Sequence, residues 1–168
     1  MARLAVRAVP LLILGMTASV RPAHASLGGD AASIEQDRAA LGASQTASTP
    51  ATTVKRAAAN GSAFAYTVHK LTTPAGVTVS EYLDASGAVF AIAWSGPVLP
   101  DLRQLLGDYF PTYSDALANL VATRRTRGPV TVDMDGLVVQ SSGRMRFFSG
   151  IAYLKDKLPA GISAADIR

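Results

Sequence analysis

Two blocks of the chain alternate apolar and polar residues with period two, and a stripe of helical period lies between them. The first block, residues 64–94, has three apolar runs separated by the turn sequences TPAG and DASG. In the second block VTVDM and LVVQS flank Asp-Gly, and RMRFFSGIAYL follows. Such alternation between turn signals predicts antiparallel strands, and Asp-Gly predicts a tight hairpin. We expect an antiparallel sheet of about six strands, a meander of three followed by a hairpin and a final strand.

The helical stripe runs over residues 102–121, where apolar side chains recur at spacings of three and four. Pro111 interrupts this stripe, because a proline inside a helix presses on the carbonyl four residues earlier, here that of Gly107. We predict a kink or a break between Gly107 and Pro111, with the stripe continuing on one face. Pro100 and Asp101 suit the first turn. The expected fold class is α+β, with the sheet packed by one long Pro-kinked amphipathic helix and a short N-terminal helix.

Large and small side chains alternate along the third strand, AVFAIAW. Because neighbouring side chains point to opposite faces of a sheet, Phe90, Ile92 and Trp94 are expected on one face. The other face would then carry small residues and leave room for the long helix. In the final strand, Gly150 predicts a bend or bulge.

The first 25 residues have the layout of a secretory signal peptide. Arg3 and Arg7 precede an apolar run over residues 8–20, and an A-x-A cleavage site ends at Ala25. The run is shorter than the about 20 residues that span a bilayer. We expect cleavage after Ala25, a periplasmic or secreted protein, and no stable membrane span after cleavage. An uncleaved anchor or a buried N-terminal helix is the alternative.

Capping signals and composition divide the rest of the chain into segments. Ser33 and Gln36 have capping-box spacing, Gly42 suits a helix stop, and Ser163 can cap a single turn in the tail. The expected organisation is a signal peptide over residues 1–25, a short helix within 26–42, an Ala/Ser/Thr-rich linker over 43–63, and a single α+β domain over 64–168.

Charge and side-chain chemistry exclude several functions. Three of the 16 basic residues leave with the predicted leader, so 13 remain against 12 acidic residues, and nothing suggests nucleic acid as a partner. The chain has no cysteine, and His69 is the one histidine outside the leader. Imidazole or thiolate metal sites and Cys-His dyads are therefore excluded, and we expect no metal or cofactor. His69 is interpreted as a packing or hydrogen-bonding group within a strand.

Carboxylates remain the candidates for acid–base chemistry. A glycosidase-like pair involving Glu81 and Asp101 is compatible with the sequence. Asp101 already suits a helix start, however, and Glu81 is expected to pair with Lys70 on the neighbouring strand. Asp133 and Asp135 precede Gly136, and the predicted hairpin turn at Asp135 and Gly136 accounts for them without a calcium ion. They are the other carboxylates that a carboxylate-dependent enzyme could use.

Two groups of residues are candidates for binding. The first group consists of the aromatic rings near the expected kink and the lone tryptophan. These side chains suit either an exposed partner site or ordinary core. The core interpretation is favoured because the rings continue the buried stripe. The arginines suit either a basic patch for an anionic envelope surface or solvated surface charge. The candidates are Trp94, Tyr109, Phe110, Tyr113, Arg124, Arg125, Arg127, Arg144 and Arg146.

Four segments carry a family resemblance: LGGDAASIEQDRAALGA, YTVHKLTTPAGVTVSEYL, GAVFAIAWSGPVLPDLRQLLGDYF and LPAGISAADIR. Together they resemble a family of uncharacterised exported proteins of Burkholderia-type proteobacteria, the domain of unknown function 2844. The resemblance covers the chain after the leader and implies an envelope setting and one domain, with no activity or catalytic residue to carry over. We expect an accessory protein that binds a protein or an envelope component. A small carboxylate-dependent envelope hydrolase or transferase is the alternative.

Overall fold

The computed structural model describes residues 27–45, 54–57, 63–123 and 128–167. Its strands are β1 (Ser44–Gln45), β2 (Val54–Ala57), β3 (Ala63–Thr72), β4 (Thr78–Leu83), β5 (Val89–Gly96), β6 (Val130–Met134), β7 (Leu137–Arg144) and β8 (Phe147–Leu154). Its α-helices are α1 (Ala31–Ala40), α2 (Leu102–Leu106) and α3 (Phe110–Thr123). Short 3-10 turns occur at η1 (Gly107–Tyr109), η2 (Lys155–Lys157) and η3 (Ala164–Asp166). The class is α+β, as the sequence predicted.

The strands form one antiparallel sheet in the order β1-β3-β4-β5-β8-β7-β6, and β2 also pairs with β3. The six predicted strands are β3 to β8, and the final strand lies between the meander and the hairpin. Asp135 and Gly136 form the hairpin turn between β6 and β7 with φ angles of 49° and 78°, as Asp-Gly predicted. The short strands β1 and β2 lie within the stretch predicted as a linker.

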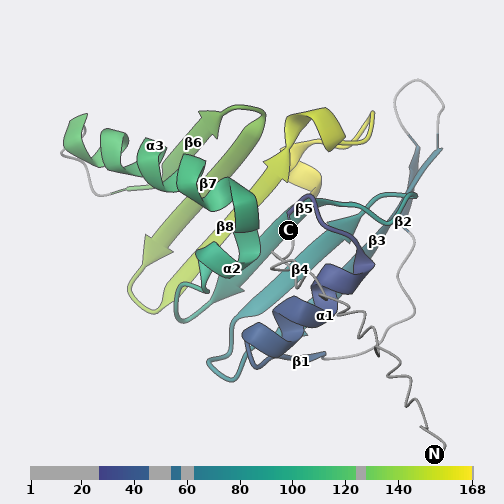
Figure 1. Cartoon of the computed structure of the whole chain (residues 1–168), viewed down its shortest axis with the longest axis horizontal. Coiled ribbons are helices and arrows are strands. Elements are labelled where there is room, and N and C mark those ends of the chain that lie inside the picture. The colour runs from purple at the N-terminus through teal and green to yellow at the C-terminus, as the bar shows by residue number, and fades with distance from the viewer. Residues whose placement is uncertain (1–26, 46–53, 58–62, 124–127, 168) are drawn as a thin grey trace, which may run out of the picture.

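The sheet has a different cover on each face. Figure 1 shows α1, α2 and α3 on one face of the sheet, where the main apolar cluster lies. On the other face, Ile162 and Ile167 of the C-terminal segment pack with Tyr66, Tyr82 and Phe90. The predicted helical turn of the tail is confirmed as η3, where Ser163 and Asp166 form a capping box.

A β-bulge in β5 overturns the predicted distribution of large and small side chains. The register between β4 and β5 shifts at Tyr82 and Leu83, and Phe90 is the extra residue. Phe90 therefore faces Tyr82, with ring centroids 6.2 Å apart, on the side away from the helices. Ile92 and Trp94 face the helices. The prediction of a small-residue face beneath the helix was wrong, because one inserted residue changes the side that later residues face.

The bulge predicted at Gly150 was also wrong. The pairing of β8 with β5 and β7 runs without a shift through Gly150, opposite Trp94 and Ser141. Glycine is needed there because a Cβ would lie 2.7 Å from Cε2 of Trp94 and 2.5 Å from the carbonyl oxygen of Gln140. The glycine thus makes room for the indole ring.

The predicted interruption of the long helix is confirmed as a break. Gly107 has a φ of 51°, and the η1 turn separates α2 from α3. Pro111 is the second residue of α3, where its missing N–H costs no helical hydrogen bond. Buried residues on both sides of the break, including Leu105 and Tyr113, belong to the main cluster, so the stripe continues toward the sheet.

Asp30, and not Ser33, caps α1. Its Oδ1 accepts hydrogen bonds from the backbone N–H groups of Ala32 (2.9 Å) and Ser33 (3.2 Å), whereas the Ser33 hydroxyl donates to the Asp30 carbonyl. The capping box predicted from Ser33 was therefore wrong, and the N-cap lies three residues earlier. Gly42 ends the helix with a φ of 58°, as predicted. Leu27 and Ile34 are buried in the main cluster, so this end of the chain is docked on the body.

Asp30→Ala is expected to lower the free energy of unfolding by about 1 kcal/mol, because two backbone donors lose their acceptor. Urea denaturation measures the change. Asp115→Ala, at an exposed position within α3, is the matched control and should change stability by less than about 0.5 kcal/mol. Equal losses in the two variants would contradict the capping role of Asp30.

Residues 1–25, where the signal peptide is predicted, lie outside the described residues. Within the described ranges, no helix combines the length and apolar character needed to cross a bilayer.

Candidate functional site

A groove with a volume of about 590 Å³ crosses the strands from β4 to β6. Its floor consists mainly of side chains on the sheet face turned away from the helices. For example, Ser80 and Ser95 alternate with Val79 and Trp94 of the main cluster. The described lining residues are Thr78, Ser80, Ala93, Trp94, Ser95, Pro129, Val130, Thr131, Gln140, Ser141, Ser142, Ser149, Gly150 and Ile151.

The lining of this groove is uncharged and rich in hydroxyl groups. None of its described residues carries an ionisable side chain. The hydroxyl oxygens of Ser142 and Ser149 lie 3.1 Å apart across β7 and β8, and Gln140 adds a side-chain amide. Such a surface can donate and accept hydrogen bonds, but it offers no group with a pKa suited to general acid–base catalysis at neutral pH. The arrangement therefore favours binding over proton transfer.

Sequence reasoning missed the groove, although a signal was present. Small polar residues occupy alternate positions of β4, β7 and β8, as in Thr78 and Ser80. That pattern is also typical of a solvated strand face. The sheet order, which places β8 between β5 and β7, is what brings these residues together.

A second pocket, of about 410 Å³, lies between α3 and β6. Its lining includes Leu120, Met134 and one carboxylate, that of Asp133. The Asp133 carboxylate forms an exposed ion pair with Lys155, whose Nζ lies 2.6 Å from Oδ1. A single, paired carboxylate does not form the acid and base combination of a glycosidase.

Two carboxyl groups meet in the interior, beneath α1. Asp37 of α1 and Glu81 of β4 are both fully buried and share a hydrogen bond. The side-chain amide of Gln104 in α2 donates to Oδ1 of Asp37 at 2.8 Å. A hydrogen bond between two carboxyl groups requires a proton on one of them. This contact connects α1, α2 and the sheet.

Burial raises the pKa of Asp37 from its ordinary value of 3.8 to about 6, because the charged form loses its hydration. The hydrogen bonds from Gln104 and Glu81 act in the opposite direction and offset part of this rise. Neither carboxyl group lines either of the two pockets. Because both carboxyl groups are fully buried, Glu81 is not an exposed acid–base residue.

The predicted pairing of Glu81 with Lys70 was wrong. In the register of β3 and β4, Glu81 lies opposite His69, whereas Lys70 lies opposite Ser80. Neighbouring residues of a strand point to opposite faces, so Lys70 is directed away from Glu81. No sequence pattern indicated that Asp37 of α1, which is separated from β4 by three strands, would be the partner of Glu81.

The other candidate carboxylates have local roles. Asp101 caps α2, with its Oδ1 accepting from the backbone N–H groups of Arg103 (2.9 Å) and Gln104 (3.2 Å). Asp135 lies in the hairpin turn. Across the described ranges, no cluster of three or more His, Cys, Asp or Glu side chains suited to a metal ion occurs.

The aromatic candidates pack within the protein, in agreement with the core interpretation. Trp94 and Tyr113 are buried in the main cluster, and Tyr109 and Phe110 are half-buried against it. The guanidinium of Arg103 lies 4.6 Å from the centroid of the Phe110 ring. These rings therefore contribute to the packing of the helices against the sheet.

The arginine candidates fall into two groups. Arg144 and Arg146 are exposed at the turn between β7 and β8. The remaining three, Arg124, Arg125 and Arg127, lie outside the described residues, so the convergence of all five into one patch stays a prediction.

The geometry defines an α+β domain with an uncharged groove on one face of its sheet. The chain belongs to the protein family of unknown function DUF2844, whose model matches residues 23–167. The family predicted from the sequence is thereby confirmed, and its export and its origin in Burkholderia-type proteobacteria stay predictions. No curated protein and no solved structure matches the chain.

Proposed function

We propose that the protein is a non-catalytic binding protein of the bacterial cell envelope that holds an uncharged, hydroxyl-rich ligand in the groove between β4 and β6. The signal-peptide pattern supports export to the periplasm or beyond. The observation that carries the proposal is the groove lining, which combines Ser, Thr and Gln side chains without an ionisable group.

The chemistry of the lining favours a neutral glycan strand as the ligand. Hydroxyl and amide groups match the donors and acceptors of sugar hydroxyls, and no charge in the described lining would remain unpaired beside them. The floor is a sheet surface with short side chains, so an extended ligand can lie along it. A charged ligand would find no counter-charge there.

Titration calorimetry with neutral oligosaccharides of glucose and of N-acetylglucosamine tests this proposal. Ser95 is exposed on the groove floor, and Ser95→Trp is expected to fill the groove and weaken binding by at least about tenfold. Ser114→Trp, on an exposed position of α3, is the matched control and should bind normally. Absence of binding by the unaltered protein, or equal binding by Ser95→Trp, would overturn the proposal.

The carboxylate-dependent hydrolase has less support. It needs two carboxyl groups across an open pocket, whereas Asp37 and Glu81 are fully buried and Asp101 caps a helix. Asp133 is paired with Lys155. We therefore prefer the binding role.

A further inference from the structure

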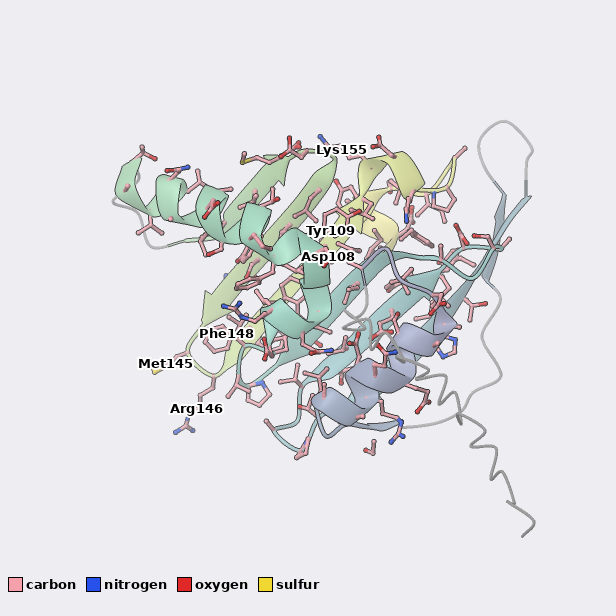
Figure 2. The ribbon with its side chains drawn as sticks, in the orientation of Figure 1. Asp108, Tyr109, Met145, Arg146, Phe148 and Lys155 are labelled. Atoms are coloured by element: carbon pink, nitrogen blue, oxygen red, sulfur yellow. The ribbon has the colours of Figure 1, made fainter. Side chains whose placement is uncertain are left out.

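Exposed apolar side chains gather at one end of the sheet, at the turn between β7 and β8 and in the loop after β5. Because Gly96 of β5 pairs with Phe148 of β8, that loop begins beside the turn. Figure 2 shows Met145 and Arg146 projecting at this end, far from Lys155 at the other end of β8. The exposed side chains and the exposed fractions of their surface are Val98 (45%), Leu99 (48%), Met145 (96%) and Phe147 (55%).

Two cations accompany this apolar group. Arg144 and Arg146 flank Met145 and are exposed, and neither has an ion-pair partner among the described residues. The carboxylate that follows the β5 loop, that of Asp101, is engaged in capping α2. The surface is therefore both apolar and positively charged.

Side-chain packing supports the hairpin of β7 and β8 that carries these residues. The ring of Phe148 lies against Gly143 on the neighbouring strand, where a Cβ would be only 2.8 Å from Cδ1 of the ring. Arg146 has a φ of 62°, a conformation that side-chain-bearing residues adopt at a cost and that glycine would adopt freely. This exposed turn therefore carries an arginine at a position where glycine would fit more easily.

We propose that this end of the sheet docks on an anionic lipid surface. Met145 and Phe147 enter the boundary between headgroups and acyl chains, and Arg144 and Arg146 bind lipid phosphates while their aliphatic stems lie along the apolar region. A lipid surface fits better than a protein partner, because a two-residue turn and one short loop with four exposed apolar side chains make a small surface beside the roughly 800 Å² that each partner contributes to a stable protein interface. This inference does not depend on the ligand of the groove.

The absence of cysteine from the sequence allows one dye to report on this turn alone. Met145→Cys, labelled with an environment-sensitive dye, is mixed with phosphatidylcholine vesicles that contain or lack phosphatidylglycerol. We expect a blue shift and quenching by a lipid-phase quencher with the anionic vesicles only. The same dye at Val121→Cys, exposed on α3, is the control for other ways of attachment, and its emission should not shift.

Charge removal completes the test. A double variant combines Arg144→Gln and Arg146→Gln in the labelled Met145→Cys protein. It is expected to bind vesicles at least about tenfold more weakly, because each arginine near an anionic membrane contributes roughly fivefold to binding. Lys70→Gln with Lys157→Gln changes the net charge equally at other exposed positions and should bind normally. An unresponsive dye at residue 145, an equal response at residue 121, or equal losses in both charge variants would overturn the proposal.

Discussion

Gly150→Ala is expected to lower the free energy of unfolding by about 3 kcal/mol, at the upper end of overpacking effects. The new Cβ would lie 2.5 Å from the carbonyl oxygen of Gln140 and 2.7 Å from Cε2 of Trp94. A backbone carbonyl in the middle of a sheet and a buried indole ring cannot both move aside without disturbing the pairing of β5, β8 and β7. Chemical denaturation measures the loss.

Gly128→Ala is the matched control, because nothing lies within 4 Å of its Cβ position. It should change stability by less than about 0.5 kcal/mol. Trp94→Leu tests the cause, because the penalty of Gly150→Ala should shrink by about 1 kcal/mol or more once the indole is removed. A penalty that is the same with either residue at position 94 would show that the ring is not what excludes a side chain from position 150.

The protein is expected to lose stability as the pH rises from about 4 to above 6, through the titration of Asp37. Its pKa is raised from 3.8 to about 6 by burial, so the folded state holds a proton that the unfolded state releases. The stabilisation is complete below pH 3.8 and is lost as the pH passes through the folded-state value of about 6. The loss attributable to this group is on the order of 3 kcal/mol.

Asp37→Asn removes this titration and keeps the shape of the side chain, so its stability should change less across the same pH range. Hydrogen exchange provides a local measurement. After correction for the intrinsic exchange rate, the backbone amides of α1 should exchange faster above pH 6 in the unaltered protein. The same amides of Asp37→Asn should show no such increase. Asp115→Asn, at an exposed position of α3, is the control and should behave like the unaltered protein. An identical pH dependence in Asp37→Asn would contradict the assignment.

Features with a local cause were predictable from the sequence. The Asp-Gly turn, the break at Gly107 and the Ser163 cap each depend on residues within one turn of chain. The six strands of the main sheet also followed from alternation between turn signals. The α+β class could be inferred because these local signals agreed with one another.

Features that depend on contacts between distant segments were not predictable. The bulge at Phe90 moves Ile92 and Trp94 beneath the helices, and alternation alone gives no sign of one extra residue. Asp37 and Glu81 meet only because α1 docks on β4. The groove requires β8 to lie between β5 and β7, and a list of serines and threonines does not specify that order.

Backbone amide NMR during titration with neutral oligosaccharides tests the proposed binding role most directly. We expect shifts confined to groove residues such as Ser95, Gln140 and Ser149, unchanged amides around Asp37 and Glu81, and an oligosaccharide that remains intact throughout. Perturbations centred on the two buried carboxyl groups, together with cleavage of the sugar chain, would contradict a non-catalytic binding protein.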